Sequence, residues 1–319
     1  MLFWFRERNY LGILLRYGWI FLLIAVLLVL FLLNVSIPGR GVQGCLDGCS
    51  KTSHHESGVL RIVSLNLLHG FPRYERLNIR LDVFLNQVQQ LDADIILLQE
   101  VPWNRQMQNA AGYLSERLGM NYLYYRANGN RQAIFFEEGE AILSRYPLKS
   151  PLFIELNPQA GFFEHRVVLQ ADVETPHGDI RLFVTHLTNG KPEINQQQVD
   201  SLLEHVLASG DMLKIIAGDF NAGQDSSQIA LLSRLWVDVF RETNPDEAGF
   251  TCCIDDLNND PSEPLEKRID YIFMAAGENT AVNLVDARLA FDKPEPVEGG
   301  WQWVSDHVGM VVTFEYKDE

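Results

Sequence analysis

Leu213-Lys214-Ile215-Ile216-Ala217-Gly218-Asp219-Phe220-Asn221-Ala222 is an apolar run that stops at a glycine and is followed by a carboxylate and a carboxamide. The run predicts a buried strand that leads into a loop. Because side chains at i and i+2 of an extended segment point the same way, Asp219 and Asn221 can reach one cavity at the carboxyl end of the strand. Such a pair suits chemistry at a phosphate, where an acid orients a water nucleophile and an amide donates to an anionic oxygen. A strand followed by an Asx turn is the alternative for this fragment alone.

Polar side chains end several other apolar runs in the same way. Residues 59–68 alternate apolar and polar side chains, which predicts a strand with Asn66 near its end. Residues 94–100 form an apolar run that ends in Glu100. Further predicted strands have these side chains at or beside their ends: His186, Asp270, Asp306 and His307. Each residue alone fits a solvated strand end or a structural histidine, but their repeated position indicates a shared site.

The order of the predicted elements indicates the fold class. Strands and amphipathic helices alternate early in the chain, whereas hairpin-like strand pairs dominate later. This order predicts an α/β sandwich of four layers, with two packed, mainly antiparallel sheets and helices outside; a doubly wound parallel sheet is the alternative. Helices are expected at 76–91, 104–118, 192–207 and 226–235. The other expected strands are 122–126, 139–147, 165–173, 179–187, 268–273 and 308–314, with a loop at 244–264.

The charge of the chain limits its partners. The 319 residues carry a net charge of −16, and 47% of them are hydrophobic. Residues 58–319 hold 21 Lys and Arg against 39 Asp and Glu, a balance of −18. A broad basic surface for a nucleic-acid backbone is therefore missing, and extended nucleic-acid binding is disfavoured without being excluded. No protein partner can be inferred.

The N-terminal part contains a long apolar run. Residues 17–33 are apolar almost without exception, and a helix of this length crosses most of a hydrocarbon core. Three arginines and one glutamate precede the run, so the positive-inside rule places the N-terminus in the cytoplasm. A cleaved signal peptide is the alternative, although no small-residue cleavage site follows. We expect a single-pass membrane protein with these parts: a cytoplasmic segment 1–16, a transmembrane anchor 17–37, a linker 38–57 and an extracytoplasmic domain 58–319.

Four cysteines are too few for a disulfide scaffold in a chain of this length. Cys45 and Cys49 lie close enough in sequence to bridge, which an extracytoplasmic location allows. Cys252 and Cys253 are adjacent, so we expect them to pack in the core or to bridge to distant cysteines rather than to pair with each other. No histidine or cysteine at zinc-site spacing surrounds them.

The side chains at the strand ends suit a hard cation. Mg²⁺ prefers few protein oxygens and keeps several waters, a demand that Glu100 and Asn66 meet. No cluster of soft ligands argues for zinc instead. A base is also available, because a neighbouring carboxylate, for which Asp270 is the candidate, would orient the imidazole of His307 and stabilise its charged form.

Six ordered motifs carry a family resemblance. They are Asn66, Gln99-Glu100, Thr185-His186, Gly218-Asp219-Phe220-Asn221, Arg268-Ile269-Asp270-Tyr271 and Ser305-Asp306-His307. In this order they resemble the motif set of the endonuclease/exonuclease/phosphatase family, which includes deoxyribonucleases, apurinic endonucleases, neutral sphingomyelinases and inositol polyphosphate 5-phosphatases. The resemblance covers residues 59–314 and implies that 58–319 is the catalytic domain.

The resemblance implies a four-layer sandwich and hydrolysis of a phosphoester by in-line attack of water, assisted by Mg²⁺ with Mn²⁺ as the alternative cation. Glu100 resembles the main metal ligand of the family, with Asn66 beside it and Asp306 as a further candidate at the same site. The cation then acts as Lewis acid and template.

The resemblance also implies the catalytic roles. His307, paired with Asp270, resembles the base or the electrostatic clamp. Asp219 is expected to orient the water, while Asn221 and His186 bind phosphate oxygens and stabilise the developing charge. How base and acid roles divide is left open by the family pattern.

Residues 139–147 resemble a family segment in which a small or amide residue often stands where this chain has Glu140. Glu140 is expected either to filter substrates or to be a solvated strand end, and we favour the solvated end. Arg145, in the same segment, is a candidate substrate-binding residue that could instead pair with an acid.

Three functions remain open. A membrane-anchored phosphodiesterase or phosphatase acting on a lipid headgroup or a small phosphoester is favoured, because the anchor concentrates the enzyme at a bilayer and the acidic domain disfavours polyanions. An extracytoplasmic nuclease with the same site is the alternative, and basic residues around the pocket would support it: Arg73, Arg76, Arg80, Arg126 and Arg131. An inactive binding protein is a further alternative, disfavoured by the intact acids and histidines.

Overall fold

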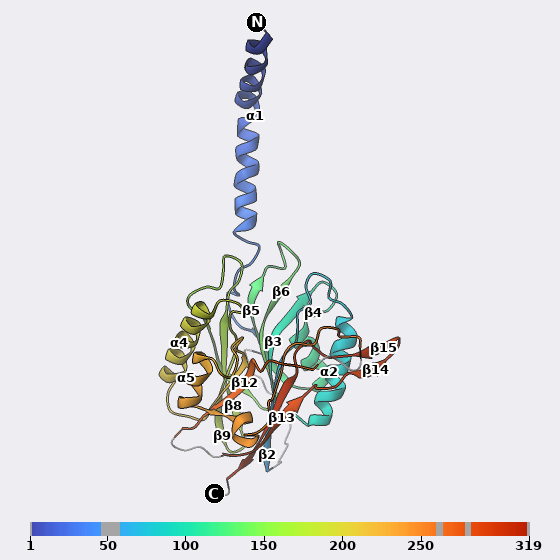
Figure 1. The fold of residues 1–319 in the computed structure, drawn as a ribbon, viewed down its shortest axis with the longest axis vertical. Helices are drawn as coiled ribbons and strands as arrows, with labels where there is room; N and C mark the ends of the chain where they lie inside the picture. Colours follow the sequence, from blue (N-terminus) through green and yellow to red (C-terminus); the bar gives the residue numbers. More distant parts are fainter. Residues whose placement is uncertain (1, 46–57, 260–263, 278–281, 318–319) are drawn as a thin grey trace.

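Two β-sheets lie against each other and form the centre of the molecule (Figure 1). The computed structural model describes residues 2–45, 58–259, 264–277 and 282–317, and the side chains of helix α1 (Leu2–Leu32) from Arg16 on. Part of the predicted linker, the predicted partner Cys49 and part of the 244–264 loop lie outside the described residues.

The first sheet has the strand order β1-β5-β6-β3-β2-β16-β13, with β4 paired to β3. Its described strands pair antiparallel except for β2 and β3, which are parallel. The strands are β1 (Gln43–Gly44), β2 (Val59–Asn66), β3 (Ile95–Asn104), β4 (Gln108–Asn109), β5 (Asn121–Gly129), β6 (Glu137–Ser144), β13 (Val282–Ala290) and β16 (Gly309–Tyr316).

The second sheet has the order β11-β12-β10-β9-β8-β7, and β9 and β10 are its parallel pair among the described strands. Its strands are β7 (Leu148–Glu155), β8 (Val167–Thr175), β9 (Gly178–His186), β10 (Lys214–Asp219), β11 (Val237–Asp238) and β12 (Asp270–Ala275). A separate hairpin joins β14 (Glu295–Val297) to β15 (Gly300–Gln302). The prediction of two mainly antiparallel sheets is confirmed, and each sheet is mixed.

Helices cover the outer face of each sheet and complete four layers. Along β2, Ile62 packs between the two sheets while Val63 packs against helices α2 and α3, so both faces of the strand are apolar. Helices α4 and α5 cover the second sheet in the same way. The helices after α1 are α2 (Leu77–Leu91), α3 (Ala110–Leu118), α4 (Pro192–Ala208), α5 (Ser227–Leu235) and α6 (Val239–Thr243).

Several predicted boundaries are wrong. The helix expected from residue 104 begins only at Ala110, because Asn104 still belongs to β3 and the side chain of Asn109 caps α3 by accepting from the Ala111 N–H. Strands β7 and β13 were not predicted. Their alternation of apolar and polar residues is weak, since exposed residues follow one another on both faces, at 149–152 in β7 and 285–286 in β13.

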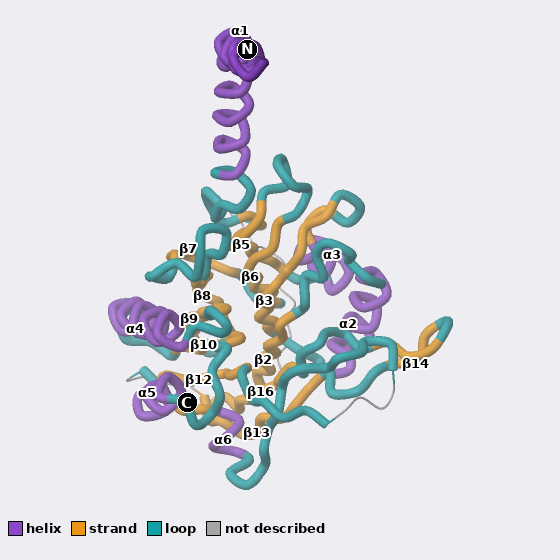
Figure 2. Tube along the Cα trace, turned by 45° about the horizontal axis from the view of Figure 1, so that its top comes forward, coloured by secondary structure: helices purple, strands orange, loops and turns teal. Residues whose placement is uncertain are grey.

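Helix α1 projects from one edge of the sandwich (Figures 1 and 2). Within the part of the chain that the structure describes, no helix is both long enough and apolar enough to cross a membrane. The transmembrane anchor predicted at 17–37 is therefore not supported. Residues 17–32 belong instead to a longer helix, and the chain after it packs on β5, where the Gly39 N–H donates to the Arg126 carbonyl at 2.8 Å.

Candidate active site

The strand ends of both sheets meet at one edge. Asn66 ends β2 beside Gln99 of the parallel strand β3, so Glu100 follows at the same edge. In the second sheet Asp219 ends β10 and pairs in register with His186 of β9 and Asp270 of β12. The structure therefore brings together side chains that lie far apart in sequence, as the strand-end pattern predicted.

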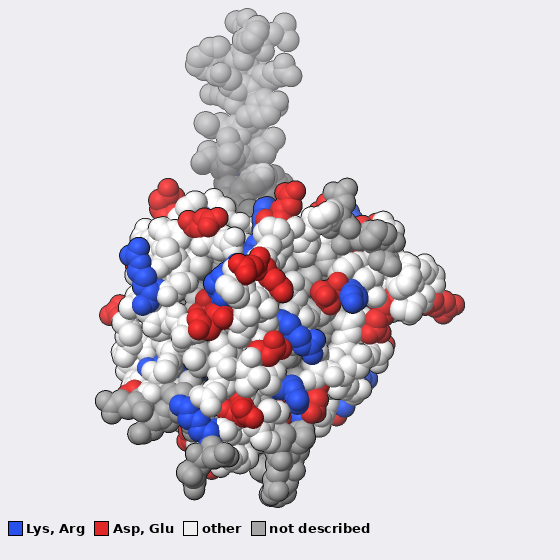
Figure 3. Space-filling model, turned by 60° about the horizontal axis from the view of Figure 1, so that its bottom comes forward, with Lys and Arg blue, Asp and Glu red and all other residues white. Residues whose placement is uncertain are grey.

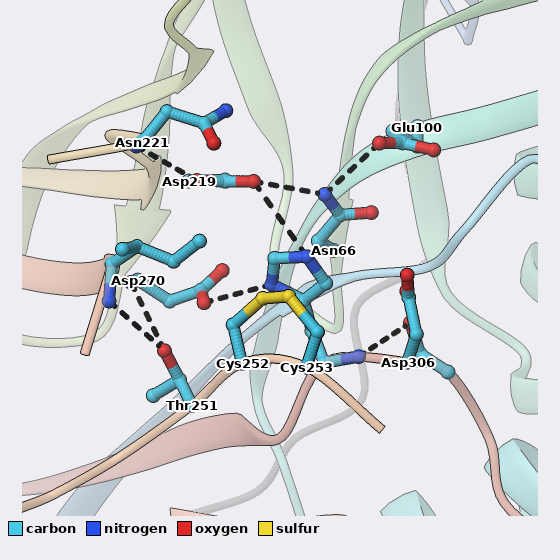
Figure 4. Close-up of a disulfide and its surroundings, with 12 residues drawn as sticks. Asn66, Glu100, Asp219, Asn221, Thr251, Cys252, Cys253, Asp270 and Asp306 are labelled. Carbon is cyan, nitrogen blue, oxygen red and sulfur yellow. Dashed lines mark hydrogen bonds and ion pairs between the residues drawn. A yellow bond between two sulfur atoms is a disulfide. The ribbon is translucent and has the colours of Figure 1, made fainter. Parts of the chain in front are cut away.

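Asn66 links the two sheets at this edge. Its Nδ2 donates to Glu100 Oε1 at 3.2 Å and to Asp219 Oδ2 at 3.1 Å, and the residue is buried (Figure 4). Glu100 has φ 52°, in the left-handed region, at the point where the register of β3 with β6 shifts. Such a bulge re-aims a side chain. Here it turns the carboxylate toward Asn66.

The carboxylate of Glu100 is held in its charged form. Burial alone would raise its pKa, but the charge of His69 and hydrogen bonds from the His69 N–H and from Asn66 hold the pKa at about 2. An ionised, buried carboxylate beside an amide suits a hard divalent cation.

His186 is buried and neutral. Burial has the largest effect on the pKa of this imidazole, and the positive charge of Arg166 adds to it. Together they hold that pKa well below its ordinary value. Its Nε2 therefore accepts from Asn221 Nδ2 at 2.9 Å, while its Nδ1 lies 3.9 Å from Glu100 Oε1 and has no hydrogen-bond partner among the described residues. Asn221 also donates to the Leu187 carbonyl, so both hydrogens of its Nδ2 are used within the protein.

Asp219, Asp270 and His307 form the other half of the site. His307 Nδ1 lies 2.9 Å from Asp270 Oδ2, and its Nε2 lies 3.8 Å from Asp219 Oδ2. Burial lowers the pKa of His307, but the charge and hydrogen bond of Asp270 outweigh it and raise that pKa well above its ordinary value. Burial has the largest effect on the pKa of Asp219, and repulsion from the charge of Asp270 adds to it. Together they raise that pKa to about 7. The trio therefore holds a proton near neutral pH.

The segment around Thr251 fixes this trio. Thr251 Oγ1 accepts from the Asp270 N–H at 3.2 Å, and the Val308 N–H donates to the Thr251 carbonyl at 2.8 Å (Figure 4). Thr251 is fully buried. It was not predicted, because a threonine inside a segment read as loop gives no distinctive pattern.

Cys252 and Cys253 form a disulfide with each other, so the expectation that they would not pair is wrong (Figure 4). Isolated β-bridges pair the backbone of Cys252 with Lys267 and with His307. They hold the two adjacent cysteines beside the site. The pair lines a pocket of about 580 Å³ together with Asn221 and Phe250.

Two groups of donor atoms at this edge suit a divalent cation. Glu100, Asn66 and Asp306, the ligands expected from the sequence, would offer hard oxygen atoms. Burial, opposed by the charge of His307, raises the pKa of Asp306. Asp219, Asp270 and His307 offer ligand atoms within 4.8 Å of one another. Asn66 would ligate through its Oδ1, which in this structure accepts from the Leu68 N–H at 3.1 Å.

A pocket of about 260 Å³ opens beside Glu100 and His186. His69 and Arg166, which sequence analysis missed, also line it. His69 stands three residues after Asn66, and Arg166 directly precedes β8. Neither position forms a recognisable motif. Glu140 is buried nearby at 1% exposure, so the favoured view of it as a solvated strand end is wrong. It lies on β6, where every residue is buried.

Arg145 lies away from the other candidate residues. It contacts Asp92 at 2.6 Å and Asp94 at 3.1 Å, at the end of β3 opposite Glu100. Two of the arginines that a nuclease could use are also occupied: Arg80 is buried against the carbonyls of Leu67, Leu68 and Val304, and Arg126 binds Glu137.

Comparisons with known proteins agree with this geometry. The sequence profile described as the Endonuclease/Exonuclease/phosphatase family matches residues 63–307. No curated protein sequence matches the chain significantly. Two solved structures with the same fold are a mannosyl-6-phosphatase from Bacteroides thetaiotaomicron VPI-5482 and a D. rerio TDP2 complexed with single-strand DNA product.

The likeness to these two structures is one of fold. Both are 20% identical to this chain, and each comparison covers 81% of this chain and 100% of the other. Their TM-scores are 0.64 and 0.62. Because the family profile matches most of the chain, from the last residues of β2 to the histidine of the site, the chain belongs to the endonuclease/exonuclease/phosphatase family of phosphoester hydrolases.

Proposed function

We propose that the chain is a Mg²⁺-dependent phosphoester hydrolase whose substrate is a lipid headgroup or a small phosphoester, attacked in line by water. The observation that carries this proposal is the Asn66 amide, which joins the ionised Glu100 to the proton-sharing trio of Asp219, Asp270 and His307. A binding protein has no need for this arrangement of buried charges, each of which costs free energy to bury.

The residues divide the chemistry between them. Asp219, held by Asn66 and by the Asn221 N–H at 2.8 Å, accepts the proton of the attacking water or orients it. His307, fixed by Asp270, supplies a positive charge close to Asp219. Neutral His186 and, after its side chain rotates, Asn221 donate to phosphate oxygens as their charge develops. Glu100 and Asn66, with Asp306, would hold a divalent cation, which would supply Lewis-acid polarisation of the phosphate.

The net charge of the chain and the contacts of its arginines favour a lipid headgroup or a small phosphoester over nucleic acid. The chain carries −16 net charge, and the described arginines expected to support nucleic-acid binding are partly used inside the protein. Polyanion binding depends on phosphate neutralisation by such side chains. A nuclease with the same site is the second candidate, and one structure of the same fold was solved with a DNA product.

The location of the protein is also a proposal. The described side chains of α1 from Tyr17 to Leu32 are mostly apolar and exposed. Exposed apolar surface of this extent is typical of a membrane or protein contact. We propose that α1 attaches the protein to a membrane, while the extracytoplasmic position of the catalytic domain stays a prediction from the sequence.

The test compares substrates with one preparation of the full chain in detergent micelles. Hydrolysis of sphingomyelin, phosphoinositides, a soluble phosphodiester and single-stranded DNA is measured with Mg²⁺ and with a chelator. Release from the lipids that requires Mg²⁺ supports the proposal. Cleavage of DNA alone would favour the nuclease.

A further inference from the structure

Four exposed phenylalanines stand at the edge of the sandwich that carries the active site. Phe71 is 40% exposed, Phe135 47%, Phe162 62% and Phe163 45%. They lie in the loops after β2, β5 and β7, which end or begin at the same edge as Asn66 and His186. We call these four residues the aromatic rim. Large aromatic side chains left in water at several neighbouring loops indicate a binding surface.

The aromatic rim borders the pocket beside Glu100 and His186. Phe163 lines that pocket directly, and so does Phe136, on whose ring Phe71 stacks with centroids 4.3 Å apart. Phe135 precedes Phe136 in the chain. Phe163 and Phe71 of the rim therefore lie beside this pocket, Phe163 directly and Phe71 through Phe136.

The chain leaving α1 is fastened to the same loops. Ser36 Oγ accepts from the Gly129 N–H at 2.9 Å, and Asn130 Nδ2 donates to the Asn34 carbonyl at 2.8 Å. Asn128, which like Gly129 belongs to β5, lines the active-site pocket. Its side chain also exchanges hydrogen bonds with the backbone of His165, in the loop that carries Phe162 and Phe163. Figures 1 and 2 both show α1 leaving the sandwich at this edge.

Two apolar surfaces therefore lie on one side of the molecule: the exposed side chains of α1 and the aromatic rim. The face turned away from α1 carries scattered Lys, Arg, Asp and Glu (Figure 3). Apolar helix side chains and exposed aromatic rings together match the interface of a bilayer, where aromatic rings are favoured. The net charge of −16 disfavours an anionic surface and leaves a zwitterionic one.

We propose that the aromatic rim binds a zwitterionic lipid surface together with α1, so that the active-site pocket opens onto the phosphate headgroups. This inference rests on the proposed function for its substrate, but the contact between the rim and lipid stands on its own. Arg105 adds a cation at the rim, since its guanidinium lies 3.5 Å from the centroid of the Phe135 ring.

The contact is tested with the full chain in phosphatidylcholine vesicles that contain brominated acyl chains. Phe162→Trp places an indole in the rim, and Leu207→Trp places one at the end of α4, where Leu207 is 60% exposed. Emission is compared with that of the parent chain. We expect the additional emission of Phe162→Trp to be quenched and that of Leu207→Trp to be unquenched. Equal emission changes for both variants in brominated and ordinary lipid would overturn the proposal.

A second measurement separates this inference from the proposed function. Phe135→Ser with Phe162→Ser should lower hydrolysis of a vesicle phospholipid by about tenfold or more, the effect of two lost aromatic contacts, and leave hydrolysis of bis-(p-nitrophenyl) phosphate unchanged. Leu207→Ser is the control. Equal loss on both substrates, or weaker binding of single-stranded DNA with unchanged lipid hydrolysis, would overturn the lipid contact. A parent chain that cleaves neither substrate contradicts the proposed function, while the quenching result remains interpretable.

Discussion

His307 Nδ1 lies 2.9 Å from Asp270 Oδ2, which places the other ring nitrogen 3.8 Å from Asp219 Oδ2. The pair of contacts joins a histidine from the segment just before β16 to acids on two neighbouring strands of the other sheet. It also explains why His307 keeps its proton although it is buried, because two carboxylates face the same ring.

Asp270→Asn should lower kcat by on the order of 100-fold or more, since the histidine loses its orienting carboxylate. The charge of Asp270 raises the pKa of His307, so its removal lowers that pKa. The limb of the pH–rate profile that reports His307 should therefore move to lower pH. Asp286→Asn, at an exposed acid of β13, is the control. If the pH–rate profile of Asp270→Asn has its limbs at the same pH as the parent chain, His307 has no catalytic role.

Glu100→Gln should weaken Mg²⁺ binding at least about 10-fold, the loss that even outer partners of a metal site can cause. The variant lacks the carboxylate of Glu100, whose pKa is held at about 2 in the parent chain so that it stays ionised. Isothermal titration with Mg²⁺ and Mn²⁺ measures the change, and Glu116→Gln on the exposed side of α3 is the matched control. Equal cation affinity in both variants would show that the cation binds elsewhere.

Glu140→Gln should stabilise the fold, and more so at higher pH. Burial, then repulsion from Glu138, raise the pKa of Glu140 well above its ordinary value. The folded chain therefore keeps a proton that the unfolded chain releases near pH 4.3, and the free energy of unfolding falls as pH rises from there toward the folded pKa. The gain in Tm should be larger at pH 8 than at pH 5. The same gain at both pH values would mean that Glu140 does not titrate in this way.

Arg145→Ala should cost about 1.5–3 kcal/mol of stability, the range for hydrogen bonds to charged groups, and leave KM unchanged. Its guanidinium joins Asp92 and the buried Asp94 at the edge opposite the site. Urea unfolding and steady-state kinetics measure the two effects. A raised KM with normal stability would instead return Arg145 to the substrate-binding residues.

The strand ends could be predicted from the sequence because the rule behind them is local. An apolar run that stops at Gly218 places Asp219 and Asn221 at a strand end whatever the rest of the chain does. Parallel pairing of β2 with β3 and of β9 with β10 then brings Asn66, Glu100 and His186 to the same edge.

Other features depend on contacts that no local pattern records. In the sequence, Glu140 has the pattern of a solvated strand end. In the structure, β6 lies inside the sheet and all of its residues are buried. The ion pairs of Arg145 need two acids that lie more than fifty residues earlier. The aromatic rim combines loops from three parts of the chain, so single exposed phenylalanines gave no signal. The disulfide of Cys252 and Cys253 depends on how one loop is held between Lys267 and His307.

The most direct test of the account is hydrolysis of phosphoesters by the full chain with Mg²⁺, with Asp219→Asn as the matched variant. We expect release of the lipid headgroup to require Mg²⁺, to stop with a chelator and to fall by on the order of 100-fold or more in Asp219→Asn, because the attacking water loses its carboxylate. Circular dichroism checks that the variant is folded. Hydrolysis that continues in the chelator, or that Asp219→Asn retains in full, would contradict the proposed site and its chemistry.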